Sequence, residues 1–155
     1  MHWYARVIDR LAGGRAFSAI ARRVAPRLDR FVYKVTGGRH LATPREIPTL
    51  LLTTVGRRSG LGRTVPLTFA TVDGHRYLVG TSFGRGGQPA WVLNLLAEPR
   101  ATAAYRGVTQ EVLAVPVSPD EHARLWPAFD AATSAYREYR QWLDRPIHMF
   151  RLEDR

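Results

Sequence analysis

The stretch LLTTVGRRSGLGRTVPL, residues 51–67, places a glycine-rich turn with three arginines between two apolar segments. The apolar segments are β-prone, which is typical of buried strands. Glycines in a turn let backbone N–H groups approach an anion, and Arg57, Arg58 and Arg63 could bind its oxygens in pairs. The pattern GxxxxGK[ST] of a P-loop is absent. The stretch predicts either a clamp for a phosphate or carboxylate, or an exposed hairpin turn without a ligand.

Further short strands are predicted along the chain, and two of them flank Asp73-Gly74, a dipeptide that favours tight hairpins. The expected strands are Thr49–Val55, Thr64–Val72, His75–Phe83, two within residues 101–118 around Arg106-Gly107, and one within residues 146–153. Helices are expected at residues 89–99 and 118–133, and helical structure continues over 135–145. About six antiparallel strands without βαβ alternation indicate a mainly β, α+β fold, a small β-barrel with helices packed outside.

Apolar residues at helical spacing are the side chains that we expect the helices to bury in the core. They are Trp91, Leu95 and Leu96 in the first helix, and Trp126, Phe129 and Trp142 in the later helical segment. Ser118 is expected to cap the helix that follows it, because serine is a preferred N-cap residue.

The formal net charge of +10 is concentrated at the N-terminus. Residues 1–40 hold nine basic residues and two acidic ones, a surplus of seven. Apolar residues from Phe17 to Val35 recur every three or four positions, which predicts an amphipathic helical arm kinked near Pro26. The arm either packs on the domain or lies on an anionic membrane through residues 1–35. The expected organisation is this arm over residues 1–40 and a barrel domain over residues 41–155.

Several function classes are disfavoured. The chain has no cysteine, so disulfides and thiolate chemistry are excluded. The five histidines form neither HxxxH nor HExxH, so no metal site is expected, and no GxSxG motif supports a hydrolase. The chain shows no signal peptide and no apolar run near the roughly 18 residues of a membrane span, so the cytoplasm is the expected compartment. Most of the basic surplus lies in the arm, so no nucleic-acid partner is required.

A second stretch, GTSFGRGGQPAWVLN (residues 80–94), runs from a strand end through a glycine-rich loop into a helix. Helix N-termini attract anions and polar ligand edges. Ser82, Gln88 and Asn94 offer hydrogen-bonding groups there, and Trp91 offers a flat apolar face. The two stretches together favour a ligand site over a bare turn.

These two stretches and the tail AYREYRQWLDRPI (residues 135–147) resemble, in this order, the deazaflavin-dependent nitroreductase family, which includes quinone reductases. The resemblance covers roughly residues 47–152. It implies a split β-barrel and coenzyme F420, an 8-hydroxy-5-deazaflavin that carries a phosphate and a polyglutamate tail. Phe83 and Thr133 depart from the nitroimidazole-activating member at positions that border its substrate, so activity on bicyclic nitroimidazoles stays open.

The resemblance implies site residues by matching position. The turn would bind the anionic side of the cofactor, the next residues would continue along it, and the second stretch would line the ring and close the site. The implied cofactor-binding residues are Arg57, Arg58, Ser59, Arg63, Thr64, Val65, Gly80, Thr81, Ser82, Phe83, Ala90, Trp91, Val92, Leu93, Asn94 and Tyr136. The hydroxyls of Ser82, Tyr136 and Tyr139 are the candidate catalytic groups, because a hydroxyl can stabilise charge that develops on an acceptor oxygen.

The implied reaction is hydride transfer from reduced F420 to a quinone or nitro acceptor. Other readings stay open: a deazaflavin carrier without catalysis, a flavin mononucleotide-binding barrel, which the three arginines favour less, and a basic interaction module. The chain is expected to be a monomer or a homodimer.

Overall fold

The computed structural model describes residues 23–24, 27–28, 32 and 47–155. The predicted arm of residues 1–40 falls almost entirely outside these residues, so the division into arm and barrel domain stays a prediction. In the part that is described, no helix combines the length and apolarity needed to cross a membrane.

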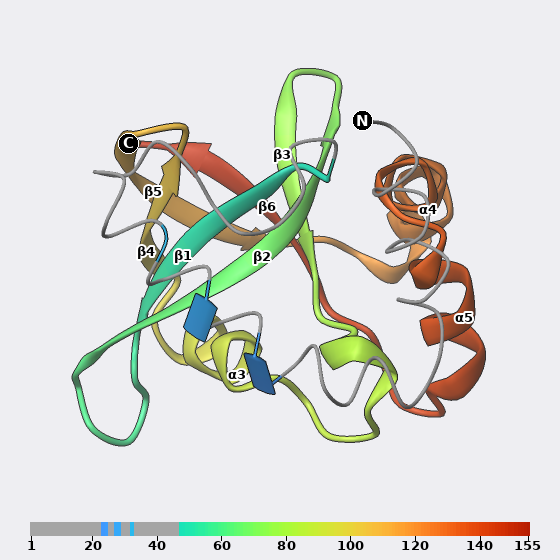
Figure 1. Ribbon diagram of the computed structural model, residues 1–155, viewed down its shortest axis with the longest axis horizontal. Helices are drawn as coiled ribbons and strands as arrows, with labels where there is room; N and C mark the ends of the chain where they lie inside the picture. The colour runs from blue at the N-terminus through green and yellow to red at the C-terminus, as the bar shows by residue number, and fades with distance from the viewer. Residues whose placement is uncertain (1–22, 25–26, 29–31, 33–46) are drawn as a thin grey trace.

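Six antiparallel strands close into a barrel, which confirms the predicted fold (Figure 1). Their order around the barrel is β1-β2-β3-β6-β5-β4, and β1 closes it by pairing with both β2 and β4. The strands are β1 (Thr49–Val55), β2 (Gly62–Val72), β3 (His75–Val79), β4 (Arg100–Tyr105), β5 (Val108–Pro116) and β6 (Met149–Asp154). The β1–β2 hairpin therefore projects the arginine turn from one end of the barrel.

The two predicted hairpin turns form as expected. Asp73-Gly74 and Arg106-Gly107 all have positive φ angles, between +50° and +82°. Such two-residue turns match the twist of the flanking strands.

The predicted strand His75–Phe83 is wrong at its end, because β3 stops at Val79. Ser82, Phe83 and Gly84 have φ angles of +50°, +54° and +74°, and this left-handed backbone cannot continue a strand. The segment forms a short 3-10 turn, η1 (Ser82–Gly84), instead.

The helices are α3 (Ala90–Ala97), α4 (Pro119–Ala132) and α5 (Ala135–Trp142). The predicted helical continuation through residue 145 is wrong in two places. Thr133 is extended and closes α4 with an N–H bond to Phe129 O, so α5 begins anew, and Leu143 ends it. Ser118 occupies the N-cap position of α4, but its hydroxyl bonds the Glu121 carboxylate rather than a backbone N–H.

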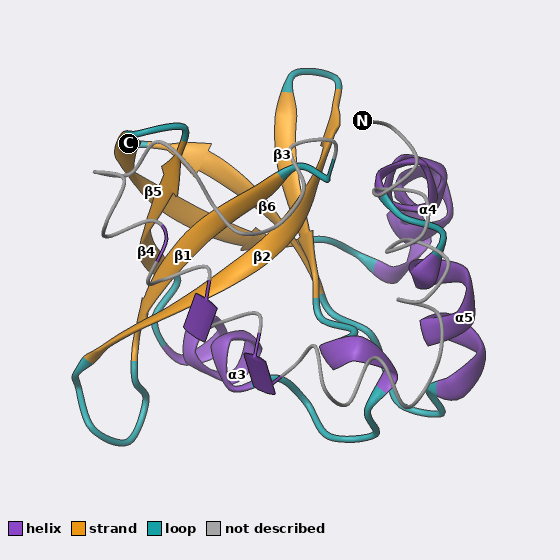
Figure 2. Cartoon of the chain, viewed as in Figure 1, coloured by secondary structure: helices purple, strands orange, loops and turns teal. Residues whose placement is uncertain are grey.

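Strand alternation divides the buried side chains between two clusters. One cluster contains Leu50, Leu52, Leu78 and Phe150 from the strands with Trp91, Val92 and Leu95 from α3. The other contains Tyr77, Val79 and Met149 from the opposite strand face with Leu125, Phe129, Tyr136 and Tyr139 from α4 and α5. The helices α4 and α5 lie together on one side of the barrel (Figure 2).

Three helix core predictions need correction. Leu96 is 48% exposed, because it follows the inward-facing Leu95 and points about 100° away on the helix. Trp126 and Trp142 are only half-buried and pack against the edge of the second cluster, whereas Phe129 is fully buried as predicted.

Candidate functional site

The arginine turn between β1 and β2 is closed by its own backbone. Gly56 N–H donates to Leu61 O at 2.8 Å, and Gly56 O accepts from Ser59 N–H and Gly60 N–H. A Cβ on Gly56 would lie 2.7 Å from Ser59 Oγ, and Gly60 has a φ of +69°. Both glycines are therefore required by the geometry of the turn.

Ser59 organises the far side of the same turn. Its Oγ accepts from Leu61 N–H and from Arg63 Nη2, each at 3.3 Å. This second bond ties the Arg63 guanidinium to the turn.

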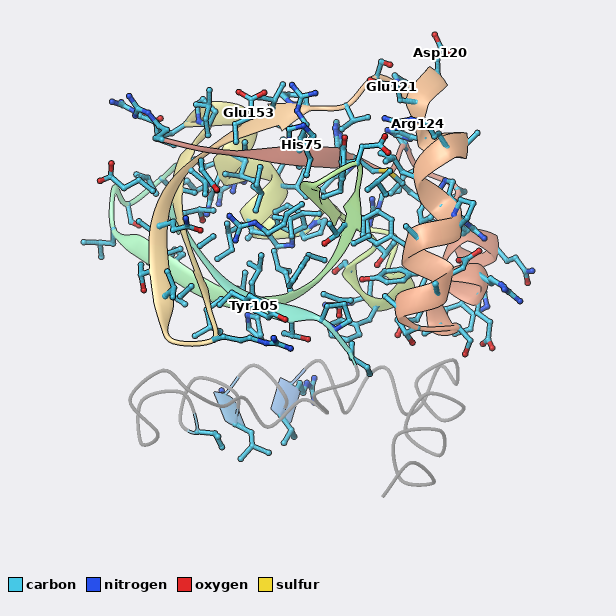
Figure 3. All side chains as sticks on the ribbon, turned by 90° about the horizontal axis from the view of Figure 1, so that it is seen from above. His75, Tyr105, Asp120, Glu121, Arg124 and Glu153 are labelled. Atoms are coloured by element: carbon cyan, nitrogen blue, oxygen red, sulfur yellow. The ribbon has the colours of Figure 1, made fainter. Side chains whose placement is uncertain are left out.

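The turn carries positive charge that no acidic residue of the described chain neutralises through a salt bridge. Arg57, Arg58 and Arg63 are exposed and form no salt bridge with any residue in the described part of the chain. Many arginines elsewhere are paired, and Figure 3 shows one, Arg124, projecting from α4 near Glu121. Three guanidinium groups within seven residues, none of them in a salt bridge with the described residues, make this turn suited to an anion.

Asn94 of α3 connects the turn to the body of the protein. Its Oδ1 accepts from Arg57 N–H at 3.1 Å, and its Nδ2 donates to Thr54 Oγ1 at 3.0 Å. Asn94 and Thr54 are both buried. The side chain therefore holds the start of the arginine turn against the end of β1.

The glycine-rich loop lies against the start of α3. Gly80 N–H donates to His148 O at 2.8 Å, and a Cβ on Gly80 would lie 2.7 Å from Val92 Cγ2. The left-handed turn that follows directs Phe83 outward, where it is 37% exposed and its ring lies 6.3 Å from that of Tyr139.

Gly84 lies directly on the aromatic surface of α5. A Cβ at this position would be 2.4 Å from the Trp142 ring and 3.3 Å from the Tyr139 ring. The loop and α5 are thus in contact at a glycine whose backbone is itself left-handed.

We expect Gly84→Ala to lower the free energy of unfolding by at least about 1–2 kcal/mol, since both a strained φ and overpacking act there. Urea unfolding measures this change. Gly86→Ala is the matched control, because no atom lies within 4 Å of a Cβ built in the same loop at that position. Equal stability of the two variants would contradict the expected contact.

Tyr136 and Tyr139 are buried, at 6% and 5% exposure. Tyr136 packs edge-on against Phe129 and Tyr139, with ring centroids 5.4 and 5.9 Å away. Its hydroxyl forms a hydrogen bond with Thr68 of β2. Burial raises the pKa of Tyr136 above its ordinary value, and the bond with Thr68 offsets part of that rise.

This shift predicts a pH dependence of stability. An unfolded tyrosine loses its proton near pH 10, while buried Tyr136 keeps it, so the free energy of unfolding falls as pH rises from about 10 toward the raised folded pKa. We expect Tyr136→Phe to cost about 0.5–1.5 kcal/mol at pH 7 through the lost bond to Thr68, and to lose less stability than wild type above pH 10. Urea unfolding at pH 7, 9 and 10.5 measures both. Tyr105→Phe, away from α4 (Figure 3), controls for loss of a tyrosine hydroxyl, and parallel wild-type and Tyr136→Phe profiles would contradict the expectation.

The structure brings the predicted site residues into one continuous path. Asn94 joins the arginine turn to α3, Gly80 joins α3 to the loop, and Phe83 joins the loop to Tyr139. Thr64 bonds Thr53 across the hairpin at 2.8 Å, and Val65 is half-buried against the barrel core. Along the rest of the path, Ala90 is exposed, Ser82 and Leu93 are half-buried, and Thr81 is buried.

Two predicted residues lie mainly in the core. Val92 is fully buried and Trp91 is 7% exposed, with its ring 5.9 Å from that of Phe150. Their side chains therefore pack in the barrel core, so the Trp91 ring does not present an open face to a ligand.

Arg145 is a site residue that the sequence interpretation missed. Its guanidinium donates to Gly80 O, Thr81 O and Arg85 O, and to Gln88 Oε1. Three of these four acceptors are backbone carbonyls, which every residue has, so no residue pattern in the sequence could have indicated the contact.

A model of the F420H(2)-dependent quinone reductase family matches residues 25–154. The chain belongs to this family. This confirms the resemblance, the oxidoreductase class and the F420 cofactor that the three motifs implied.

Individual proteins similar to this chain include two F420-dependent reductases. The F420H(2)-dependent quinone reductase Rv1261c of Mycobacterium tuberculosis is 36% identical over 129 residues, covering 78% of this chain and 84% of that protein. A solved F420-H2 dependent reductase, FDR-A, has a TM-score of 0.62 and 29% identity, covering 68% of this chain and 94% of that one. A structure described as a domain-swapped dimer has a TM-score of 0.65 and 28% identity, covering 82% of this chain and 94% of that one.

The turn fits the anionic part of F420. Three guanidinium groups that form no salt bridge in the described part of the chain match the phosphate and carboxylates of the cofactor in charge. Most backbone N–H groups of the turn are already bonded within the protein, so the anion-binding groups are the guanidinium groups rather than the backbone.

Proposed function

We propose that this quinone reductase family member transfers a hydride from reduced F420 to a quinone. The reaction takes place at a site that extends from the arginine turn, along the loop at residues 80–88, to Tyr139. The observation that carries the proposal is the turn whose three arginines form no salt bridge with the described residues and which buried Asn94 fixes against β1 and α3. Reduced F420 supplies the hydride when it is bound.

The binding role belongs to the turn and the helix beside it. Arg57, Arg58 and Arg63 bind the phosphate and glutamate groups, and Ser59 holds Arg63 in place. Asn94 positions the backbone of Arg57. Gly80 to Phe83 line the ring, and the first turn of α3 closes the site.

The protein must also deliver a proton, because a hydride alone leaves a reduced quinone one proton short of the quinol. Ser82, Tyr136 and Tyr139 are the candidate donors. Ser82 is half-buried beside exposed Phe83, whereas the Tyr136 hydroxyl is buried and bonded to Thr68. We therefore assign the acceptor side to Ser82, and also to Tyr139, because its ring contacts that of exposed Phe83. We assign Tyr136 the role of supporting Tyr139 through their ring contact.

The test is a fluorescence titration with F420 and, separately, with flavin mononucleotide, followed by addition of menadione to the complex with reduced F420. The proposal expects micromolar F420 binding and oxidation that depends on menadione. Binding without oxidation would indicate a carrier, and tighter binding of flavin mononucleotide would indicate a flavin protein. If neither cofactor binds, the proposal fails.

We further propose that residues 1–35 bring the enzyme to an anionic membrane, where lipid-soluble quinones are found. The support is the surplus of positive charge in residues 1–40 and the helical spacing of their apolar residues. Full-length protein is expected to co-sediment with phosphatidylglycerol vesicles more than with phosphatidylcholine vesicles. A chain of residues 41–155 is expected to bind F420 but not the vesicles, and equal vesicle binding by both chains would contradict the division at residue 40.

A further inference from the structure

The turn at residues 82–84 adopts an unfavourable backbone conformation. Ser82 and Phe83 have φ angles of +50° and +54°, although neither is glycine. Side chains with a Cβ are rarely found there, and such conformations persist where the surrounding structure holds them. The turn has two backbone hydrogen bonds of its own, from Gly84 N–H to Thr81 O at 3.0 Å and from Arg85 N–H to Ser82 O at 3.2 Å.

One guanidinium group binds the backbone on both sides of this turn. Arg145 Nη2 donates to Gly80 O at 3.1 Å and Thr81 O at 3.3 Å, which precede the turn, and to Arg85 O at 3.2 Å, which follows it. Arg145 Nε adds a second bond to Arg85 O at 3.3 Å. The two ends of the turn are therefore held by the same planar group.

A second tie reinforces this arrangement. Arg145 Nη1 donates to Gln88 Oε1 at 3.0 Å, and Gln88 Nε2 donates to Pro146 O at 2.9 Å. The loop is thus attached at its beginning, its middle and its end to the two residues Arg145 and Pro146.

These contacts require arginine. The acceptors are neutral oxygens, and none of the salt bridges in the described part of the chain includes Arg145. Partial burial lowers the pKa of Arg145, which Asp144 only partly offsets, so the charge is desolvated without an ion-pair partner. Only the fork of guanidinium donors reaches carbonyls in several directions, whereas a lysine ammonium is a single point.

We propose that Arg145 is a positioning residue that latches the turn at residues 82–84 and so sets Ser82 and Phe83 beside Tyr139, on the acceptor side of the site. The role at the acceptor side rests on the proposed function, whereas the latch itself rests only on the contacts described above. The arginine turn, which binds the anionic side of F420, is held separately by Asn94, so that side has a different support from the loop at residues 80–88.

Arg145→Lys tests the latch, with Arg137→Lys as the matched control, because exposed Arg137 makes only a 3.5 Å ion pair with Asp130. Hydrogen exchange of the ligand-free protein is followed over residues 80–88. Arg145→Lys is expected to speed exchange there by at least about tenfold, since several hydrogen bonds are lost, while Arg137→Lys matches wild type. Unchanged exchange in Arg145→Lys would overturn the proposal.

Kinetics then test the positioning role. Arg145→Lys is expected to lower kcat with menadione by about tenfold or more, since misplacement near the reacting groups is costly. The dissociation constant of F420 should change less than kcat, because the arginine turn that binds its anionic side is unaltered. Faster loop exchange with an unchanged kcat would overturn the role in positioning.

Two outcomes separate the latch from the proposed function and from general unfolding. If wild type neither binds nor oxidises reduced F420, the proposed function and the acceptor role fail together, while exchange in ligand-free Arg145→Lys still decides the latch. If Arg145→Lys loses protection throughout the chain, Gln88→Ala removes one acceptor and leaves the guanidinium. It is expected to raise exchange in the loop by about threefold or more, from the loss of the two bonds that the Gln88 side chain forms with Arg145 and Pro146, and unchanged exchange would overturn the latch.

Discussion

Alanine at both Arg57 and Arg63 is expected to weaken F420 binding on the order of 100-fold, because a hydrogen bond to a charged group is worth about 1.5–3 kcal/mol and exposure keeps each near the lower limit. Neither guanidinium has a salt-bridge partner in the described part of the chain, so their charge is available to a ligand. Fluorescence titration of F420 measures the change. The effect should shrink as salt is added, because exposed charges are screened.

The matched control removes the same charge at a distance from the site. Arg106→Ala/Arg155→Ala takes away two exposed arginines from the β4–β5 turn and the C-terminus. Its affinity for F420 should stay close to that of wild type. If both double variants weaken binding equally, the turn acts only through the net charge of the protein, and the clamp is wrong.

The second large effect is expected for Asn94→Ala, which removes a buried side chain that bonds both Arg57 N–H and Thr54 Oγ1. Both groups would lose their protein partner, so we expect the free energy of unfolding to fall by about 2–4 kcal/mol. F420 binding should weaken by about tenfold or more, because the start of the turn is no longer fixed. Urea unfolding and F420 titration measure the two effects.

Two variants separate the contributions of Asn94. Asn94→Asp keeps an acceptor for Arg57 N–H but loses the donor to Thr54, so its affinity for F420 should lie between wild type and Asn94→Ala. Leu96→Ala, on the exposed face of the same helix, should leave F420 binding unchanged. An Asn94→Ala protein with wild-type stability would show that the two hydrogen bonds of Asn94 do not stabilise the fold.

The arginine turn and the loop differ in how far they could be predicted. The glycines and arginines of the turn are adjacent in the sequence, so their spacing alone indicated an anion site. The loop followed a β-prone run, so a strand was predicted as far as Phe83. In the structure, Gly84 lies on the Trp142 ring and Arg145 binds carbonyls on both sides of the turn, and these contacts support a left-handed backbone in place of a strand. Local propensity does not depend on such long-range contacts, so it could not predict where the strand ends.

Local signals in the sequence were sufficient for the strands, the two tight hairpins and the arginine turn, because β-propensity, turn dipeptides and clustered charge act over a few residues. Three ordered motifs then identified the family. Only the tertiary structure decided that Asn94 holds a turn 37 residues before it and that Arg145 holds Gly80 across 65 residues. It also decided which side of α3 faces the core, so that Leu95 is buried and Leu96 is exposed. The physical reason is that these contacts join backbone groups and faces that become neighbours only when the barrel closes.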